Sequence, residues 1–124
     1  MRILLSVKPA FVHEIMTGKK LFEFRKQLFK HTEVKTIVIY ASSPICKVVG
    51  EFEIGDIIKD SPQNVWEKTK AYSGVTPSFY FQYFENRDVA YAIEITNIIE
   101  YPEPLSLNDL WEGLKPPQSF CYID

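Results

Sequence analysis

The chain has 124 residues, of which 46% are hydrophobic and 15% aromatic, so it can bury one core without disulfide bonds. Its formal net charge of −2 argues against a protein that binds nucleic acid through bulk positive charge. No apolar run approaches the roughly 20 residues that span a bilayer, and the first residues lack the apolar segment of a secretory leader. We therefore expect a soluble cytoplasmic protein without membrane contact, in which Cys46 and Cys121 remain thiols.

The first half of the chain has the composition of a β-sheet interrupted by one helix. Apolar, β-branched and alternating segments predict strands at residues 2–7, 21–25, 37–40 and 47–58. Pro9 is suited to the first turn of a helix, and Gly18 to the position after its end. Gly50 lies inside the last of these strands, where a glycine predicts a β-bulge that bends the sheet.

The second half places helices between its strands. Ser61 and Thr76 each precede a proline, a pattern typical of an N-cap followed by the first helical residue. We expect helices at residues 61–73, 76–86 and 105–114, a strand from 89 that ends at Pro102, and a last strand within 116–123. The order predicts a single α+β domain over residues 1–124, with five or six mainly antiparallel strands curled into a small β-barrel.

Charge is distributed unevenly along the sequence. Residues 1–36 carry eight basic and three acidic side chains, a net charge of +5, whereas the remainder carries a net charge of −7. Such asymmetry can make one face attractive to phosphates while the whole chain stays acidic. The alternative is that the basic and acidic segments pack beside each other.

One acidic residue stands inside the basic segment "TGKKLFEFRKQ". If residues 21–25 form a strand, Glu23 and Arg25 share one face, and the two phenylalanines between and before them share the other. The flexible side chain of Lys20 can swing toward Glu23 from the preceding turn. The segment therefore predicts a Lys–Glu–Arg group on a rigid element, or else a surface ion pair worth at most about 1 kcal/mol.

The spacing Gly18-x-Lys20-x-x-Glu23-x-Arg25 resembles the G-x-K-x-x-E-x-R signature of the ASCH domain, a family of the PUA-like superfamily. The order of the strands that follow also resembles that family, over essentially the whole chain. The resemblance implies a PUA-like β-barrel with helices packed over its ends, and a cleft beside the signature that binds RNA or a modified nucleoside. Lys20, Glu23 and Arg25 would line this cleft.

Each signature residue suits a role in such a cleft. Arg25 can hold a phosphate or a base edge with two hydrogen bonds, Glu23 can accept from an exocyclic amine, and Lys20 supplies a mobile cation. In the implied fold, further candidates for RNA or nucleoside binding come from strand ends, the first inserted helix and the last loop: Ser6, Lys8, Tyr40, Ser42, Trp66, Gln118 and Ser119. Core packing is the alternative for the aromatic residues, and a turn or cap role for the serines.

The resemblance leaves open whether the chain is an enzyme. Some ASCH-like proteins are amidohydrolases that act on N4-acetylcytidine through a lysine, a threonine and a distant glutamate. Lys20 matches the lysine, but Glu23 stands where the threonine is expected, so a mechanism would have to use Lys20 and Glu23 as catalytic residues. Binding is therefore our leading hypothesis, and N4-acylcytidine hydrolysis or ribonuclease activity is the second. A module that binds a protein partner is the third.

Metal and cofactor chemistry has no support in the residue spacing. His13 and His31 fall in different predicted elements, and no pair of cysteines or histidines has the spacing of metal ligands. The sequence also lacks a phosphate-binding glycine loop and a dinucleotide-binding fingerprint. We therefore expect neither a metal nor a cofactor.

Overall fold

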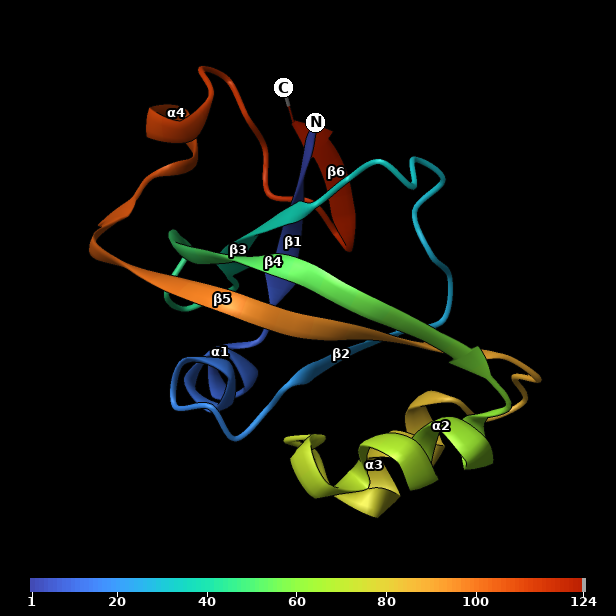
Figure 1. The fold of residues 1–124 in the computed structure, drawn as a ribbon. Coiled ribbons are helices and arrows are strands. Elements are labelled where there is room, and N and C mark those ends of the chain that lie inside the picture. The colour runs from blue at the N-terminus through green and yellow to red at the C-terminus, as the bar shows by residue number, and fades with distance from the viewer. Residues whose placement is uncertain (124) are drawn as a thin grey trace.

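The computed structural model describes residues 1–123, which form one curled six-stranded sheet with four α-helices and a 3-10 turn (Figure 1). The strands are β1 (Arg2–Val7), β2 (Phe22–Arg25), β3 (Thr36–Ala41), β4 (Lys47–Asp60), β5 (Ala90–Leu105) and β6 (Phe120–Ile123). The helices are α1 (Pro9–Met16), α2 (Pro62–Thr69), the 3-10 turn η1 (Lys70–Tyr72), α3 (Pro77–Tyr83) and α4 (Leu107–Leu110). Among residues 1–123, none of the helices has the length and hydrophobicity of a membrane-spanning segment.

The strands lie in the order β2-β5-β4-β3-β1-β6, and every neighbouring pair is antiparallel except β1 and β3. The sheet curls into a half-barrel, which confirms the predicted α+β barrel-like fold. The bulge predicted at Gly50 is also confirmed, because the β3–β4 register slips between Gly50 and Val48. A Cβ atom at Gly50 would lie 2.4 Å from the carbonyl oxygen of Ile99, so only glycine allows the long strands β4 and β5 to approach here.

The main core fills the concave side of the sheet. Alternating residues of β1 and β3 point inward, among them Leu5 and Ile39, and α1 covers them with Val12 and Ile15. The intervening residues of the same strands form a smaller core on the convex side, under α4. In Figure 1, α1, α2 and α3 lie on one side of the long β4–β5 pair and α4 lies on the other.

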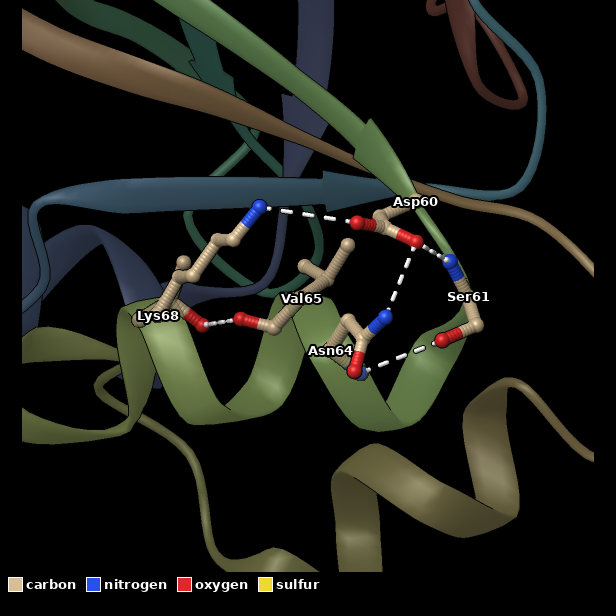
Figure 2. Close-up of polar contacts among 6 residues, drawn as sticks. Asp60, Ser61, Asn64, Val65 and Lys68 are labelled. Atoms are coloured by element: carbon tan, nitrogen blue, oxygen red, sulfur yellow. Dashed lines mark hydrogen bonds and ion pairs between the residues drawn. The ribbon is translucent and has the colours of Figure 1, made fainter.

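A separate apolar cluster packs α2 and α3 against β2 and the first residues of β5. Trp66 and Tyr80 pack with Phe24 of β2 and with small residues of β5. Both predicted N-caps are confirmed: the Ser61 hydroxyl accepts from the backbone N–H of Asn64, and the Thr76 hydroxyl accepts from that of Phe79. Figure 2 shows that the first of these caps is reinforced by the carboxylate at the end of β4.

Several boundaries differ from the expectation, and among them α3 ends at Tyr83 rather than at residue 86 and α4 covers only Leu107–Leu110 of the expected 105–114. The first inserted helix ends its α-helical part at Thr69 and continues only as the 3-10 turn. Strand β5 runs through Pro102 to Leu105, and its register with β4 jumps from Glu100 to Leu105, an irregularity at which a strand tolerates a proline. The final strand begins only at Phe120, so residues 116–119 form a loop instead. Cys46 and Cys121 are free thiols, as predicted.

Candidate functional site

A cavity of about 330 Å³ opens beside β2, between the start of α1, helix α3 and the loop before β6. Its polar lining residues come from three separate parts of the chain: Ser6, Lys8, Lys20, Glu23, Arg25, Gln118 and Ser119. The rest of its lining is apolar or aromatic: Val7, Phe11, Phe24, Val75, Phe79, Tyr80 and Tyr83. The signature segment therefore borders a concave site, as expected.

Lys20 is held in the wall of this cavity with only 2% of its surface exposed. Its ammonium donates to the carbonyl oxygen of Ser73 at 2.9 Å. The same nitrogen lies 4.7 Å from the ring centroid of Phe24 and 5.4 Å from that of Phe11, both within cation–π range. The loop that provides Ser73 passes over the aliphatic part of Lys20 at Gly74, where no side chain would fit. Lys20 is thus fixed rather than mobile, contrary to the expectation.

Glu23 and Arg25 form an ion pair at 3.6 Å, with side-chain exposures of 10% and 16%. These exposures exclude the surface ion pair that was the alternative reading. Strand β2 fixes both side chains through its antiparallel ladder with β5. The guanidinium of Arg25 also donates to the hydroxyl of Ser119 from the loop before β6. The predicted Lys–Glu–Arg group therefore lies in one wall, partly shielded from water.

Burial changes the acidity of this group. It lowers the pKa of the Lys20 ammonium, against the opposing attraction of Glu23. It also raises the pKa of the Glu23 carboxyl, although Lys20 and Arg25 both favour the charged carboxylate. The two shifts reduce the difference in proton affinity between Lys20 and Glu23.

The net charge of the lining favours an anion. Lys8, Lys20 and Arg25 contribute three positive charges, and Glu23 contributes one carboxylate. Within residues 1–123, no group of three His, Cys, Asp or Glu side chains is placed to hold a metal ion. The remaining polar residues of the lining hold the walls together or face solvent. Ser6 donates from its hydroxyl to the carbonyl of Pro117 at 2.6 Å, which fixes the loop before β6.

The aromatic wall from α3 was not predicted. Phe79 and Tyr83 lie one helical turn apart with nearly parallel rings, 6.3 Å between centroids and 6° between planes. Phe11 meets Phe79 edge-on at 5.3 Å, and the ammonium of Lys8 lies 5.7 Å from the Phe79 centroid. Residues 79–84 include five aromatic residues, which could have indicated such a wall, but the sequence analysis interpreted this segment only as part of a helix.

Three predicted binding residues lie outside the cavity lining. Tyr40 is buried in the convex-side core, because strand alternation turns it away from the inward-facing Ile39. Ser42 follows β3, and its carbonyl oxygen accepts from the backbone N–H of Ile45 in a turn. Trp66 is buried between α2 and α3, with its ring 4.7 Å from that of Tyr80. Their alternative roles, core packing and a turn, fit these positions better.

The sequence profile of the ASCH domain matches residues 5–99, which include the end of β1, the signature segment and most of β5. The chain belongs to the ASCH domain family. The resemblance that the signature suggested is thus confirmed.

Comparison with individual proteins agrees with this membership. An ASCH domain-containing ribonuclease of Zymomonas mobilis is 28% identical over 123 residues, which is 96% of this chain and 82% of that protein. The crystal structure of ASCH from Zymomonas mobilis superposes with a TM-score of 0.90 at 25% identity, covering 99% of this chain and 87% of the other. The N-terminal domain of Staphylothermus marinus McrB shares the fold alone, with a TM-score of 0.54 and 14% identity over 91% of this chain and 80% of that one.

Other similar sequences are much longer than this chain. The ATP synthase subunit alpha of Ureaplasma parvum is 27% identical over 122 residues, which is 98% of this chain but only 15% of that protein. The large ribosomal subunit protein uL22 of the same species is 29% identical over 91 residues, 73% of this chain and 29% of that protein. This chain therefore spans less than a third of the length of these two relatives.

Proposed function

We propose that this ASCH domain binds single-stranded RNA by taking one nucleotide into the cavity beside β2. The observation that carries the proposal is the combination of an aromatic wall with three cations and one carboxylate in a single cavity. The volume of about 330 Å³ falls in the range of about 300–1,000 Å³ that is usual for small-ligand sites. The name of the Zymomonas mobilis relative, a ribonuclease, supports RNA as the ligand.

The lining suggests how a nucleotide would be held. The exposed face of Phe79 offers a surface on which a base can stack, and such stacking is worth about 1–3 kcal/mol per base. Glu23 would accept a hydrogen bond from an exocyclic amine, as carboxylates do with cytosine. Arg25 and Lys8 would contact phosphate, because they are the less buried cations of the lining.

Two phenylalanines of α3 give a matched test. Phe79 and Phe81 are 37% and 38% exposed, but only Phe79 lines the cavity. We expect Phe79→Ala to weaken binding of a fluorescently labelled single-stranded RNA octamer by at least about fivefold in an anisotropy titration, from the stacking energy given above. Phe81→Ala should leave the affinity within twofold of wild type. Equal affinities of all three proteins, or no binding by wild type, would refute the proposal.

RNA cleavage at the same site is the second candidate. It is favoured by the buried Lys20 beside Glu23, with pKa values shifted toward each other, and by the ribonuclease relative. A neutral Lys20 would take the proton of a ribose 2′-hydroxyl while its oxygen attacks the adjacent phosphorus. The bond from phosphorus to the 5′ oxygen would break, and a protonated Glu23 would donate to that oxygen. The products would be a 2′,3′-cyclic phosphate and a free 5′-hydroxyl.

Product analysis separates cleavage from binding alone. We expect wild type to form 2′,3′-cyclic phosphate ends on the octamer, and Lys20→Met to form none while its circular dichroism spectrum stays native. An intact octamer after incubation with wild type would exclude cleavage of this RNA and leave the binding proposal standing. Incubation with N4-acetylcytidine, followed by an acetate assay, tests the amidohydrolase hypothesis. That hypothesis and the protein-interaction hypothesis stay predictions.

A further inference from the structure

A second cavity, of about 260 Å³, adjoins the first one and is lined mainly by Arg25, Lys26, Tyr83, Arg87, Ser119 and Phe120. We propose that it is a second subsite of the RNA strand, which binds the phosphodiester next to the nucleotide held in the first cavity. This inference rests on the proposed function and specifies its ligand: a strand of at least two nucleotides rather than a free nucleoside.

The two cavities form consecutive parts of one path. They share Arg25, Tyr83 and Ser119 as lining residues. Three segments of the chain line both cavities, and in each segment the residues that follow those of the first cavity line the second. The β2 wall continues into Lys26, the α3 wall continues to Arg87, and the wall before β6 continues into Phe120. An RNA strand that leaves the first cavity past Arg25 therefore enters the second cavity.

The lining of the second cavity is cationic, and one of its cations, Arg25, pairs with the carboxylate of Glu23 in the first cavity. Arg25, Lys26 and Arg87 contribute to the lining of the second cavity, and none of its described lining residues is acidic. Within residues 1–123, neither Lys26 nor Arg87 forms an ion pair with a carboxylate. The ammonium of Lys26 lies 4.6 Å from the ring centroid of Tyr83, which orients it beside the boundary between the cavities.

This arrangement has the chemistry of a phosphate subsite. Cations without carboxylate partners remain available to a phosphodiester, and their contacts are sequence-independent. The first cavity contains the carboxylate of Glu23 and the exposed aromatic face of Phe79, whereas the second contains neither. The two subsites therefore have different roles: the first recognises the base, and the second binds the phosphodiester backbone of the RNA. A mononucleotide would use only the first, because Arg25 and Lys8 would hold its single phosphate there.

The test compares ligands of different length on paired variants. Lys26→Gln/Arg87→Gln removes two cations of the second cavity, and Lys30→Gln/Lys35→Gln removes two exposed cations that line neither cavity. The probes are cytidine 5′-monophosphate and a mixed-sequence single-stranded RNA octamer, titrated by calorimetry at several salt concentrations. Thermal unfolding checks that both variants remain folded.

We expect the Lys26/Arg87 variant to bind the octamer about three- to tenfold more weakly than wild type, with a shallower dependence on salt of about 0.7 per lost phosphate contact. Its affinity for the mononucleotide and both affinities of the Lys30/Lys35 variant should stay within twofold. If wild type binds both probes and the Lys26/Arg87 variant binds the octamer equally well, the second subsite is refuted and the proposed function stands. If wild type binds neither probe, the proposed function itself fails.

Discussion

Arg25 and Ser119 lie 94 positions apart, and the hydrogen bond from the guanidinium to the hydroxyl joins the two open edges of the half-barrel. Arg25 ends β2, the strand at one edge of the sheet, and Ser119 immediately precedes β6 at the other edge. The backbone N–H of Ser6 donates to the carbonyl of Ser119 at 3.0 Å and holds this loop in place. Both cavities border the hydrogen bond between Arg25 and Ser119, so the contact that joins the two sheet edges also lies at the centre of the proposed site.

Ser119→Ala tests the importance of this contact. The substitution removes one hydrogen bond to a charged group at a partly exposed position, so the free energy of unfolding should fall by about 1 kcal/mol or less. Because Arg25 then loses its partner across the gap, we expect affinity for the RNA octamer to fall by about two- to fivefold. Ser43→Ala, at an exposed position after β3 outside both cavities, should change neither quantity. An unchanged octamer affinity in Ser119→Ala would show that the contact is not needed for binding.

The signature trio could be predicted because it depends on local geometry. Strand alternation over residues 21–25 and the turn at Gly18 are enough to bring Lys20, Glu23 and Arg25 into one region. Ser6, Lys8 and Ser119 followed from strand ends that meet in the family's fold. The depth of burial of Lys20 could not be predicted, because it depends on a loop more than 50 residues away in the chain.

The aromatic wall required tertiary information that the sequence does not supply. Residues 79–84 contain five aromatic residues, and the faces that they present are decided by how α3 packs on β2 and α1. Trp66 illustrates the opposite error, since a large aromatic residue on an inserted helix filled the core instead of a binding site. Propensity identified the helices correctly but not the direction in which their side chains point.

The raised pKa of Glu23 predicts a specific dependence of stability on pH. A carboxyl whose pKa is higher in the folded state binds protons more strongly there than in the unfolded chain. Its contribution to the free energy of unfolding therefore decreases as pH rises above the ordinary Glu pKa of 4.5 and through the folded-state value. Glu23→Gln should remove this decrease, so the stability of the variant relative to wild type should increase with pH across this range.

Chemical denaturation of both proteins at several pH values from about 4 to 8 measures this difference. Taking the difference between wild type and Glu23→Gln cancels the titration of all carboxyl groups outside this site. A difference that is constant with pH, or that falls as pH rises, would contradict the direction of the Glu23 shift.

The N-cap of α2 predicts a loss of stability at a position far from the cavities. Ser61→Ala removes the hydroxyl that accepts from the backbone N–H of Asn64, an exchange that typically costs about 0.5–2 kcal/mol. The neighbouring Asp60 carboxylate also accepts from the backbone N–H of Ser61 and is retained in the variant, so we expect about 1 kcal/mol (Figure 2). Thermal denaturation measures the change, and RNA affinity should be unaffected. A loss below about 0.3 kcal/mol would show that Asp60 alone is sufficient.

Gly74 is the residue on which the position of Lys20 depends. Its φ of +68° is unfavourable for any other residue, and an added Cβ would lie 2.4 Å from the Cβ of Lys20. Gly113 provides the matched control, because its φ of +78° is similar but nothing lies within 4 Å of its added Cβ.

Gly113→Ala should therefore show the backbone cost alone, about 1–2 kcal/mol. Gly74→Ala should lose at least about 1 kcal/mol more, because the clash involves the beginning of the Lys20 side chain rather than its flexible end. Displacing Lys20 would also break its hydrogen bond to Ser73 and alter the wall of the first cavity, so RNA affinity should fall only in Gly74→Ala. Equal losses of stability in the two variants, measured by urea denaturation, would mean that the loop moves away from Lys20 without cost and that Gly74 does not position it.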